Sequence, residues 1–454
     1  MTKLSKLIIT IVILFAIIPI YSQWHNELVE SYSSNPSIAL NSSDQPHILY
    51  YSAGDFRMKH AHYDGSTWHY EIPDNSSVNG IFKVVKIDDL GNLHVAYQDD
   101  TNRTLRYAFY DGSTWQTELV EDTGLYDGNM ISMALDASGN PHITHFDSGA
   151  ANFDLLYVYY DGSSWQYEEV DTTCNSYRYS SIAIDSDGKA HISHTDDYPG
   201  FELRYAVFDG TTWTYETVDD YGDIQYYNSI DLDSSEHPHI AYFESGAEDL
   251  RYAYFDGSVW HTETVDSYDR VGMYLSMVLD DNDNPHISYY DNTNDRLKYA
   301  YHNGSEWIIE VVDESEVDVG WSTSIALDSS GAPHIACGIA YLEGVKYAYL
   351  QNGANTEDIS IGSDSFLTNY PNPFDHQTNI RFELPKTSSV TLTIYDSIGR
   401  IVDVIVKGEV MNSGMHTLNW TGCDKNGHKI PSGVYTCSLE TDDFIQSKRM
   451  VLIK

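Results

Sequence analysis

The chain of 454 residues is long enough for two or three domains, and 41% of its residues are hydrophobic, so it can bury a sizeable core. It carries 68 acidic and only 25 basic residues, which gives a formal net charge of -43. A surface this negative repels nucleic acid and anionic lipid, so neither is expected as a partner.

The N-terminus has the pattern of an export signal. Lys3 and Lys6 precede an apolar run at 7–20, and the small residue Ser22 follows it. This pattern is typical of a signal peptide, so residues 1–22 are predicted to be removed on export to the periplasm. The run is shorter than the roughly 20 residues that span a membrane, and no later segment is apolar enough. We therefore expect no transmembrane span in the mature protein.

A unit of 47 to 49 residues recurs over residues 23–353. Each copy has a His at the start of an apolar run and an acid or its amide six positions earlier. Seven copies in register indicate a repeat architecture. The histidines are His47, His94, His142, His191, His239, His286 and His334, and the preceding residues are Asn41, Asp88, Asp136, Asp185, Asp233, Asp280 and Asp328.

Each copy also has four short runs rich in Ile, Val, Tyr, Phe and Thr, separated by polar turns. An Asp-Gly or Asn-Gly pair suits a hairpin turn before the last run, which starts with Trp and has Glu three positions later. Four strands per repeat predict propeller blades, so the fold class is all-β, with a seven-bladed β-propeller at 23–353. The last copy lacks its fourth run. The run that starts at Trp24 is expected to supply it and to close the ring.

The recurring His is interpreted as structural. His286 and Asp280 flank a short hairpin turn, so their side chains are expected to meet, and a carboxylate fixes the tautomer of a buried His. A catalytic residue is needed once, whereas a structural residue is needed in every blade. A basic residue also recurs, and Arg251 is expected opposite Glu263 as a cross-strand ion pair, with a charged ligand contact as the alternative.

The pattern HISYYDxxxxxLKYAYxxGxxW resembles the blades of fungal and bacterial fucose-specific lectins. The family's Arg position falls on the recurring His, and its Glu position falls on a Tyr, or on His60 in the first copy. Without that Arg/Glu pair the resemblance implies a lectin-like frame rather than fucose specificity, and 37 Tyr and 9 Trp offer rings on which sugars stack. The alternative is that most of these rings fill spaces between blades. The implied ligand-binding candidates are His94, His142, His191, His239, His286, Tyr107, Tyr157, Tyr205, Tyr252 and Tyr299.

No enzyme or metal motif is complete. The turn after Tyr63 resembles the Asp box of sialidases, but Gly65 directly follows Asp64 and no Ser stands two places before it. Residues 185–188 resemble part of a calcium loop, but Lys189 falls at a ligand position. We expect no catalytic residue, no metal site and no cofactor, with non-specific Ca²⁺ binding at the acidic rim as the alternative.

The C-terminal part is a different domain. A polar linker at 354–366 precedes alternating strand runs with Gly and Pro turns, which predict a small immunoglobulin-like β-sandwich at 367–454. It resembles the type A C-terminal sorting domain of type IX secretion cargo, which implies recognition by the outer-membrane secretion machinery. An unrelated immunoglobulin-like module is the alternative, and Cys423 and Cys437 could pair. The sorting-signal residues that carry the resemblance are Tyr370, Pro371, Asn372, Pro373, Phe374, Gly433, Tyr435 and Lys454.

Together these patterns predict a secreted or outer-surface, non-catalytic binding protein with glycan as the leading ligand class. The alternative is a protein-interaction or adhesion scaffold without sugar affinity. Its partner would bind where the repeats differ, as at 171–180 or 315–323. A glycoside hydrolase or sialidase-like enzyme is the third interpretation.

Overall fold

The computed structural model describes residues 24–76, 79–122, 128–147, 154–171, 179–196, 200–224, 226–313, 318–350, 367–370, 374, 376–384, 386–396, 400–425, 428–441 and 445–453. The chain divides into two compact units, Met1–Gly353 and Ala354–Lys454. The predicted signal peptide and the linker at 354–366 lie outside the described residues. In the part that is described, no helix is long and apolar enough to cross a membrane.

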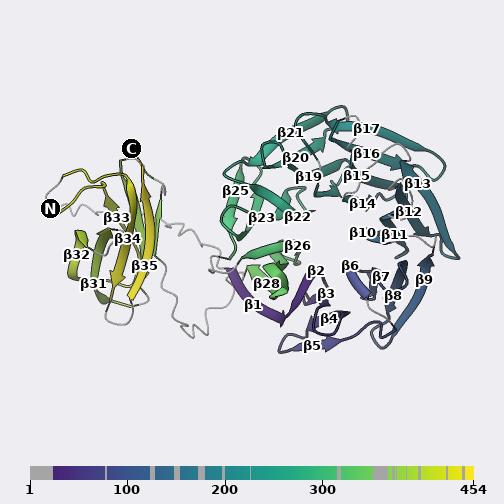
Figure 1. Ribbon diagram of the computed structural model, residues 1–454, viewed down its shortest axis with the longest axis horizontal. Helices are drawn as coiled ribbons and strands as arrows, with labels where there is room; N and C mark the ends of the chain where they lie inside the picture. Colours follow the sequence, from purple (N-terminus) through teal and green to yellow (C-terminus); the bar gives the residue numbers. More distant parts are fainter. Residues whose placement is uncertain are drawn as a thin grey trace, which may run out of the picture. The chain divides into compact units, whose positions relative to one another are not determined.

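The first unit is a ring of seven four-stranded antiparallel sheets, which confirms the seven-bladed β-propeller (Figure 1). The first strand of each blade lines the centre and the last lies outermost. Blade 1 contains β2(Ser33–Leu40), β3(Pro46–Ser52), β4(Arg57–Tyr63) and β5(Trp68–Glu71), and blade 2 contains β6(Asn79–Ile87), β7(Leu93–Asp99), β8(Thr104–Tyr110) and β9(Trp115–Glu121). Blade 3 contains β10(Asn129–Leu135), β11(Pro141–Asp147), β12(Asp154–Tyr160) and β13(Trp165–Asp171), and blade 4 contains β14(Ser180–Ile184), β15(Ala190–Asp196), β16(Glu202–Phe208) and β17(Trp213–Asp219). Blade 5 contains β18(Asn228–Leu232), β19(Pro238–Glu244), β20(Asp249–Phe255) and β21(Trp260–Asp266), and blade 6 contains β22(Val271–Leu279), β23(Pro285–Asp291), β24(Arg296–His302) and β25(Trp307–Val311).

Blade 7 is made from both ends of the propeller sequence. It contains β26(Val319–Leu327), β27(Pro333–Ile339), the short 3₁₀ turn η1(Ala340–Leu342), β28(Gly344–Leu350) and β1(Trp24–Ser31). Strand β1 pairs antiparallel with β28, with Trp24 opposite Leu350. The prediction that the N-terminal strand completes the seventh blade is therefore confirmed.

Antiparallel order divides the connections between two faces of the ring. The turns between first and second strands and between third and fourth strands lie on one face, which we call the Asp face because Asp side chains build these turns. The loops between second and third strands and the links between blades lie on the other, which we call the loop face.

The third turn of a blade has four residues, and this changes the expected register. In blade 5 the amide of Asp256 donates to the carbonyl of Val259, and Gly257 has φ +89°, which favours glycine. Tyr252 therefore faces Glu263, and Arg251 faces Thr264. The prediction that Arg251 lies opposite Glu263 is wrong, because the turn has four residues rather than three, which moves the pairing by one position.

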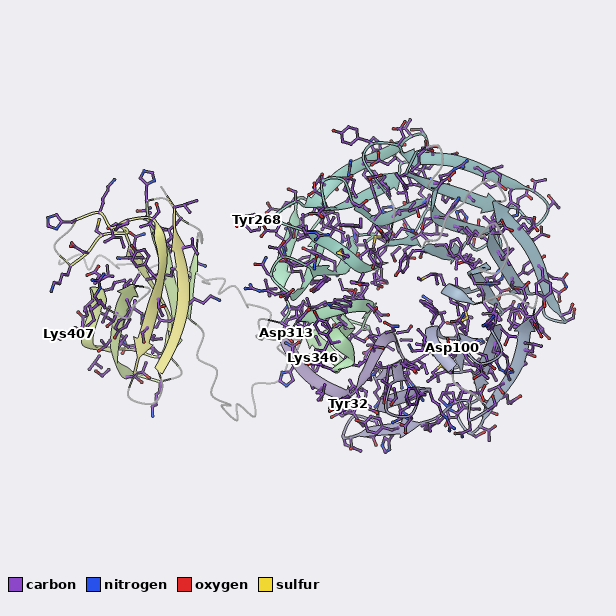
Figure 2. All side chains as sticks on the ribbon, in the orientation of Figure 1. Tyr32, Asp100, Tyr268, Asp313, Lys346 and Lys407 are labelled. Atoms are coloured by element: carbon purple, nitrogen blue, oxygen red, sulfur yellow. The ribbon has the colours of Figure 1, made fainter. Side chains whose placement is uncertain are left out.

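The recurring basic residues instead reach the last strand of the preceding blade. Arg251 Nη1 lies 3.5 Å from Asp219 Oδ2. Arg204 Nη1 also has an acid of its own blade, Asp196, 2.9 Å away. These ion pairs join neighbouring blades. The other inter-blade pairs are Lys59–Glu30 at 2.8 Å, Arg106–Asp74 at 3.5 Å, Lys298–Asp266, and Lys346–Asp313 at 2.6 Å, whose two side chains Figure 2 labels side by side.

We expect Asp266→Ala to destabilise the propeller by about 3 to 5 kcal/mol, because it leaves a buried Lys298 ammonium without its counter-charge. Asp266 also accepts a hydrogen bond from the Tyr289 hydroxyl at 2.7 Å, which would be lost. Urea unfolding measures the change. Asp187→Ala is the matched control, because the Asp187 side chain is 72% exposed beside Lys189 and should cost less than about 1 kcal/mol. Equal losses in the two variants would contradict the prediction.

The second unit is a sandwich of two sheets, in the orders β29-β30-β33 and β32-β31-β34-β35. Phe374, Trp420 and Tyr435 pack in its core. Cys423 and Cys437 are free thiols, so the suggested disulfide is absent, and burial raises the pKa of Cys437 to about 12. The strands are β29(Leu367–Tyr370), β30(Thr378–Leu384), β31(Ser388–Asp396), β32(Ile401–Met411), β33(Gly414–Trp420), β34(Gly433–Glu440) and β35(Ile445–Leu452).

Candidate binding surfaces

The recurring His is one member of a buried Asp–His–Tyr chain. In blade 6 the Tyr299 hydroxyl donates to His286 Nδ1 at 2.5 Å, and His286 Nε2 faces Asp280 Oδ2 at 3.7 Å. The expected meeting of Asp280 and His286 is confirmed, and the carboxylate beside Nε2 favours the ring proton there, which leaves Nδ1 to accept from the hydroxyl. Equivalent His–Tyr bonds join His94 to Tyr107, His142 to Tyr157, His191 to Tyr205 and His334 to Tyr347 at 2.5 Å, and also join His239 to Tyr252.

The recurring Trp and Glu lock each blade to the next. Trp307 Nε1 donates to Glu263 Oε1 of the preceding blade at 2.8 Å, and its ring meets the ring of Tyr252 edge-on, with centroids 5.3 Å apart. Each such Tyr is therefore held between the His of its own blade and the Trp of the next. Equivalent Trp–Glu bonds are Trp24–Glu310, Trp115–Glu71, Trp165–Glu118 and Trp260–Glu216.

All ten residues that the lectin resemblance implies are placed in these chains. His94, His142, His191, His239, His286, Tyr107, Tyr157, Tyr205, Tyr252 and Tyr299 are each less than 9% exposed. Their contacts give each of them a role in holding the ring together. Carbohydrate binding by them stays a prediction.

Burial also decides the protonation of the recurring histidines. It lowers the pKa of His142 to about 4, against the partly compensating charge of Asp136. Burial lowers the pKa of His286 in the same way. These rings are therefore neutral at physiological pH, as acceptance of a Tyr hydroxyl bond at Nδ1 requires.

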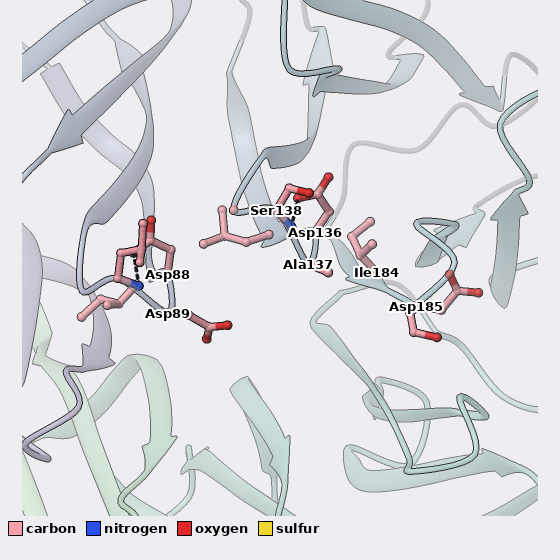
Figure 3. Close-up of a pocket in the computed structure, with 12 residues that line it drawn as sticks. Asp88, Asp89, Asp136, Ala137, Ser138, Ile184 and Asp185 are labelled. Atoms are coloured by element: carbon pink, nitrogen blue, oxygen red, sulfur yellow. Dashed lines mark hydrogen bonds between the residues drawn. The ribbon is translucent and has the colours of Figure 1, made fainter.

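The Asp face has an open pocket of about 590 Å³ between the first turns of blades 2, 3 and 4 (Figure 3). Asp88, Asp136 and Asp185 line it. Asp88 Oδ1 accepts the amides of Leu90 at 3.0 Å and Asn92 at 2.8 Å. These carboxylates accept hydrogen bonds from the amides of the hairpin turns and face the recurring histidines, so their contacts within the fold explain why each turn has an Asp.

The channel along the centre of the ring is lined by the first strand of every blade and encloses about 660 Å³. Serines link neighbouring strands there; Ser229 Oγ, for example, accepts the amide of Met277 at 3.1 Å. Lys86 and Asp231 are charged residues in this lining. Asp231 Oδ2 accepts the amide of Leu279 of the next blade at 2.9 Å, so it too supports the ring.

The loop face has a row of aromatic rings that the repeat pattern does not require. We call Tyr179, Tyr227, Tyr274, Trp321 and Tyr341 the aromatic row; they come from blades 4 to 7. Successive ring centroids are 4.4, 4.6, 5.4 and 6.5 Å apart. Tyr227 is buried in the core between Tyr179 and Tyr274, and the row becomes exposed at its Tyr341 end. A run of rings that reaches the surface is typical of a binding surface.

Polar groups and further exposed rings accompany the row. Asp318 Oδ1 accepts hydrogen bonds from Trp321 Nε1 at 3.0 Å and from the Tyr290 hydroxyl at 2.7 Å. Tyr341 is 86% exposed, and it sits at φ +60°, in the left-handed region. Other exposed rings in the links and loops of this face are Tyr32, Phe56, Tyr221 and Tyr268, of which Figure 2 labels Tyr32 and Tyr268.

Two members of the row belong to segments that already stood out in the sequence. Tyr179 lies in 171–180 and Trp321 in 315–323, where the repeats differ. Sequence reasoning missed Tyr227, Tyr274 and Tyr341. A detectable signal was an aromatic residue at or just before the first strand in blades 4 to 7.

In the C-terminal unit, two of the predicted sorting residues belong to the core. The Phe374 ring packs on Trp420 at 5.6 Å, and the Tyr435 hydroxyl donates to the carbonyl of Pro431 at 2.8 Å. Gly433 starts β34 and Tyr370 ends β29. Pro371, Asn372, Pro373 and Lys454 lie outside the described residues. The role of these residues in sorting stays a prediction.

A protein-family model described as the FlgD Ig-like domain matches residues 368–443. The match covers most of the second unit and agrees with its two-sheet architecture. None of the curated protein sequences matches the chain.

Several solved structures resemble the propeller. An ulvan lyase has a TM-score of 0.50 and 14% identity, over 71% of this chain and 96% of its own. The fungal Aleuria aurantia lectin, a six-bladed β-propeller with a fucose recognition mode, has a TM-score of 0.43 and 14% identity, over 61% of this chain and 96% of its own. At this identity the ulvan lyase match shows a shared fold and nothing further.

PorZ of Porphyromonas gingivalis, a bacterial surface component of the type IX secretion system, has a TM-score of 0.46 and 13% identity, over 90% of this chain. The chain spans 58% of the length of PorZ.

Proposed function

We propose that this protein is a non-catalytic carbohydrate-binding protein that acts outside the cell, and that carbohydrate binds on the aromatic row of the loop face. The observation that carries the proposal is the continuous run of rings from Tyr179 to Tyr341 beside Asp318. Ring faces pack against the apolar faces of sugars, and a few fixed polar groups orient the hydroxyls.

The position of the row supports this location over the spaces between blades. The recurring Tyr and Trp already contact one another there, as Tyr252 and Trp307 do. Tyr179, Tyr227 and Tyr341 lie on connections, whereas Tyr274 and Trp321 lie near the starts of β22 and β26, where the pairing with the second strand is irregular. Irregular backbone at strand ends often re-aims side chains toward a site.

Export and delivery are part of the same proposal. The sequence of residues 1–22 has the pattern of a signal peptide, and the tail resembles a type IX sorting domain. We infer that the second unit is recognised by the outer-membrane secretion machinery and that the propeller reaches the surface or the medium.

Two alternatives remain distinct from this proposal. An adhesion scaffold would use the same face for a protein partner and would bind no sugar. A glycoside hydrolase would need two carboxylates that flank the scissile bond, about 5 to 9.5 Å apart. Asp318 is held by Trp321 and Tyr290, which suits positioning of a ligand better than proton transfer.

A glycan array with the chain from residue 23 to residue 454 tests the proposal. We expect binding to one sugar class, and Tyr341→Ala should weaken it about tenfold, as loss of a contact ring typically does. Tyr341 is 86% exposed, so folding should be unaffected. Leu90→Ala is the matched control, because Leu90 is 87% exposed on the Asp face.

Binding that survives Tyr341→Ala but not Leu90→Ala would move the site to the Asp face. No binding by folded protein would overturn carbohydrate binding and favour the scaffold. Release of reducing ends from a bound glycan would favour the enzyme.

A further inference from the structure

Blade 1 departs from the other six at the positions that join blades. It has His60 where the others have the buried Tyr, and Asn41 where the others have Asp. It also has His62 two positions after His60, where the other blades have Phe, Tyr or Val. Three changes at structural positions of one blade indicate that this blade does something the others do not.

The strand register brings these residues to one face of the blade. His62 lies opposite both His47 and His69, and His60 lies opposite Glu71. Neighbouring imidazole rings are stacked, with centroids 5.1 Å apart for His60 and His62. This face, on β4 and β5, is turned toward blade 2, whose Trp115 ring meets the His60 ring edge-on, with centroids 5.6 Å apart.

Donor atoms converge at this place. His60, His62 and Glu71 each offer one ligand atom, and these atoms all lie within 4.8 Å of one another. His60 is fully buried, and the Nδ1 atoms of His60 and His62 have no hydrogen-bond partner among the residues that the structure describes. Glu71 Oε2 lies 4.0 Å from His60 Nδ1, too far for a hydrogen bond. Buried nitrogens without a partner cost stability unless another species binds them.

We propose that this cluster binds a divalent transition-metal ion through His60, His62 and Glu71. Two imidazole nitrogens and one carboxylate suit Zn²⁺ and its neighbours in the first transition row, whereas Ca²⁺ prefers oxygen ligands throughout. Three protein ligands leave a coordination position for water or a ligand. His62 and Glu71 are only half-buried, so the ion has a path from solvent.

The surrounding groups orient the ligands. Trp115 Nε1 donates to Glu71 Oε2 at 2.8 Å, and His47 Nδ1 lies 3.0 Å from His60 Nε2. Such outer contacts fix the ligand rings and carboxylates of metal sites. With the ion on Nδ1, His60 carries its proton on Nε2 and donates it to His47. His47 then carries its own proton on Nε2, so this atom no longer accepts the long 3.3 Å hydrogen bond from Asn41 Nδ2.

Calorimetric titration of the chelator-treated full chain with Zn²⁺ tests the proposal, and Co²⁺ absorption in the visible reports the coordination. We expect one ion per chain, and His62→Gln should weaken binding at least about tenfold. The double variant His60→Tyr/Asn41→Asp restores the residues of the other blades, so it should fold and should not bind. His261→Gln is the control, because His261 is an exposed His on the fourth strand of blade 5, bonded to Asp256.

Absence of binding by the folded parent, or equal affinity in the parent, in His62→Gln and in the double variant, would overturn the proposal. Loss of binding in His261→Gln as well would assign the ion to the general acidic surface and would overturn it too. The outcome is independent of carbohydrate binding, because the aromatic row belongs to blades 4 to 7.

Discussion

Deletion of residues 24–31 should destabilise the propeller more than any single substitution described above. This strand contacts three blades. It forms the outer strand of blade 7 along β28, and Trp24 donates to Glu310 of blade 6 at 2.9 Å. Glu30 accepts the Tyr50 hydroxyl at 2.5 Å and the Lys59 ammonium at 2.8 Å, both from blade 1.

The expected result is a fall of about 10 °C or more in the unfolding midpoint, which corresponds to several kcal/mol. The exposed edge of β28 should also promote aggregation, since an unpaired strand edge templates further pairing. Differential scanning calorimetry and light scattering measure the two effects. A synthetic peptide of residues 24–32 added to the truncated protein should restore part of the stability.

Trp24→Ala is the matched comparison, because it removes the bond to Glu310 and the edge contact with Tyr299 but keeps the strand. Its cost should be about 3 to 5 kcal/mol at most, within the usual range for loss of a large side chain. A midpoint unchanged by the deletion would show that the ring is stable without closure by β1.

Acid should unfold the propeller in a pH window set by the recurring histidines. Burial lowers the pKa of these rings, to about 4 for His142 and to about 3 for His47, whose neighbours His60 and His62 lower it further. Between the unfolded value of about 6.5 and these folded values, the unfolded chain binds more protons. The contribution of these neutral rings to the free energy of unfolding is therefore fully present above about pH 6.5, and it is lost as the pH drops toward 4. The other recurring rings are also shifted down; they are His94, His191, His239, His286 and His334.

Each shifted ring contributes a slope of at most about 1.4 kcal/mol per pH unit, so several together should lower the free energy of unfolding by several kcal/mol between pH 7 and pH 5. Urea unfolding at a series of pH values measures this slope. Asp280, the partner of His286, does not contribute in this window, because its pKa lies below the ordinary 3.8.

The variant His286→Gln separates this effect from general acid sensitivity. It should be less stable at pH 8, since the bonded ring is lost. Below pH 6.5 its unfolding should take up at most one proton fewer, so its free energy of unfolding should fall less steeply with pH. His69→Gln is the control, because the exposed His69 lies outside the recurring column. A parent protein with constant stability from pH 7 to pH 5 would contradict neutral, buried histidines.

The sequence alone determined the ring and its closure. The repeat period, the four strands per repeat and the unpaired run at Trp24 can all be read from local patterns. Because the pattern recurs, alignment of its copies shows where each unit begins and ends. The repetition also favoured a structural interpretation of the His and Asp, and the structure places them in contact within each chain of side chains. Repetition itself distinguishes a residue that every blade needs from one that a single site needs.

Only the tertiary structure decided which residues of different blades meet. The partner of Arg251 is Asp219 rather than Glu263, because one extra turn residue shifts the pairing and the true contact crosses a blade boundary. The aromatic row joins rings about 50 residues apart in sequence, and the cluster of His60, His62 and Glu71 forms across two strands against blade 2. Such sites depend on the few positions where a repeat differs from its copies. A search for the repeated pattern ignores the positions where one copy differs, whereas folding brings those positions together in space.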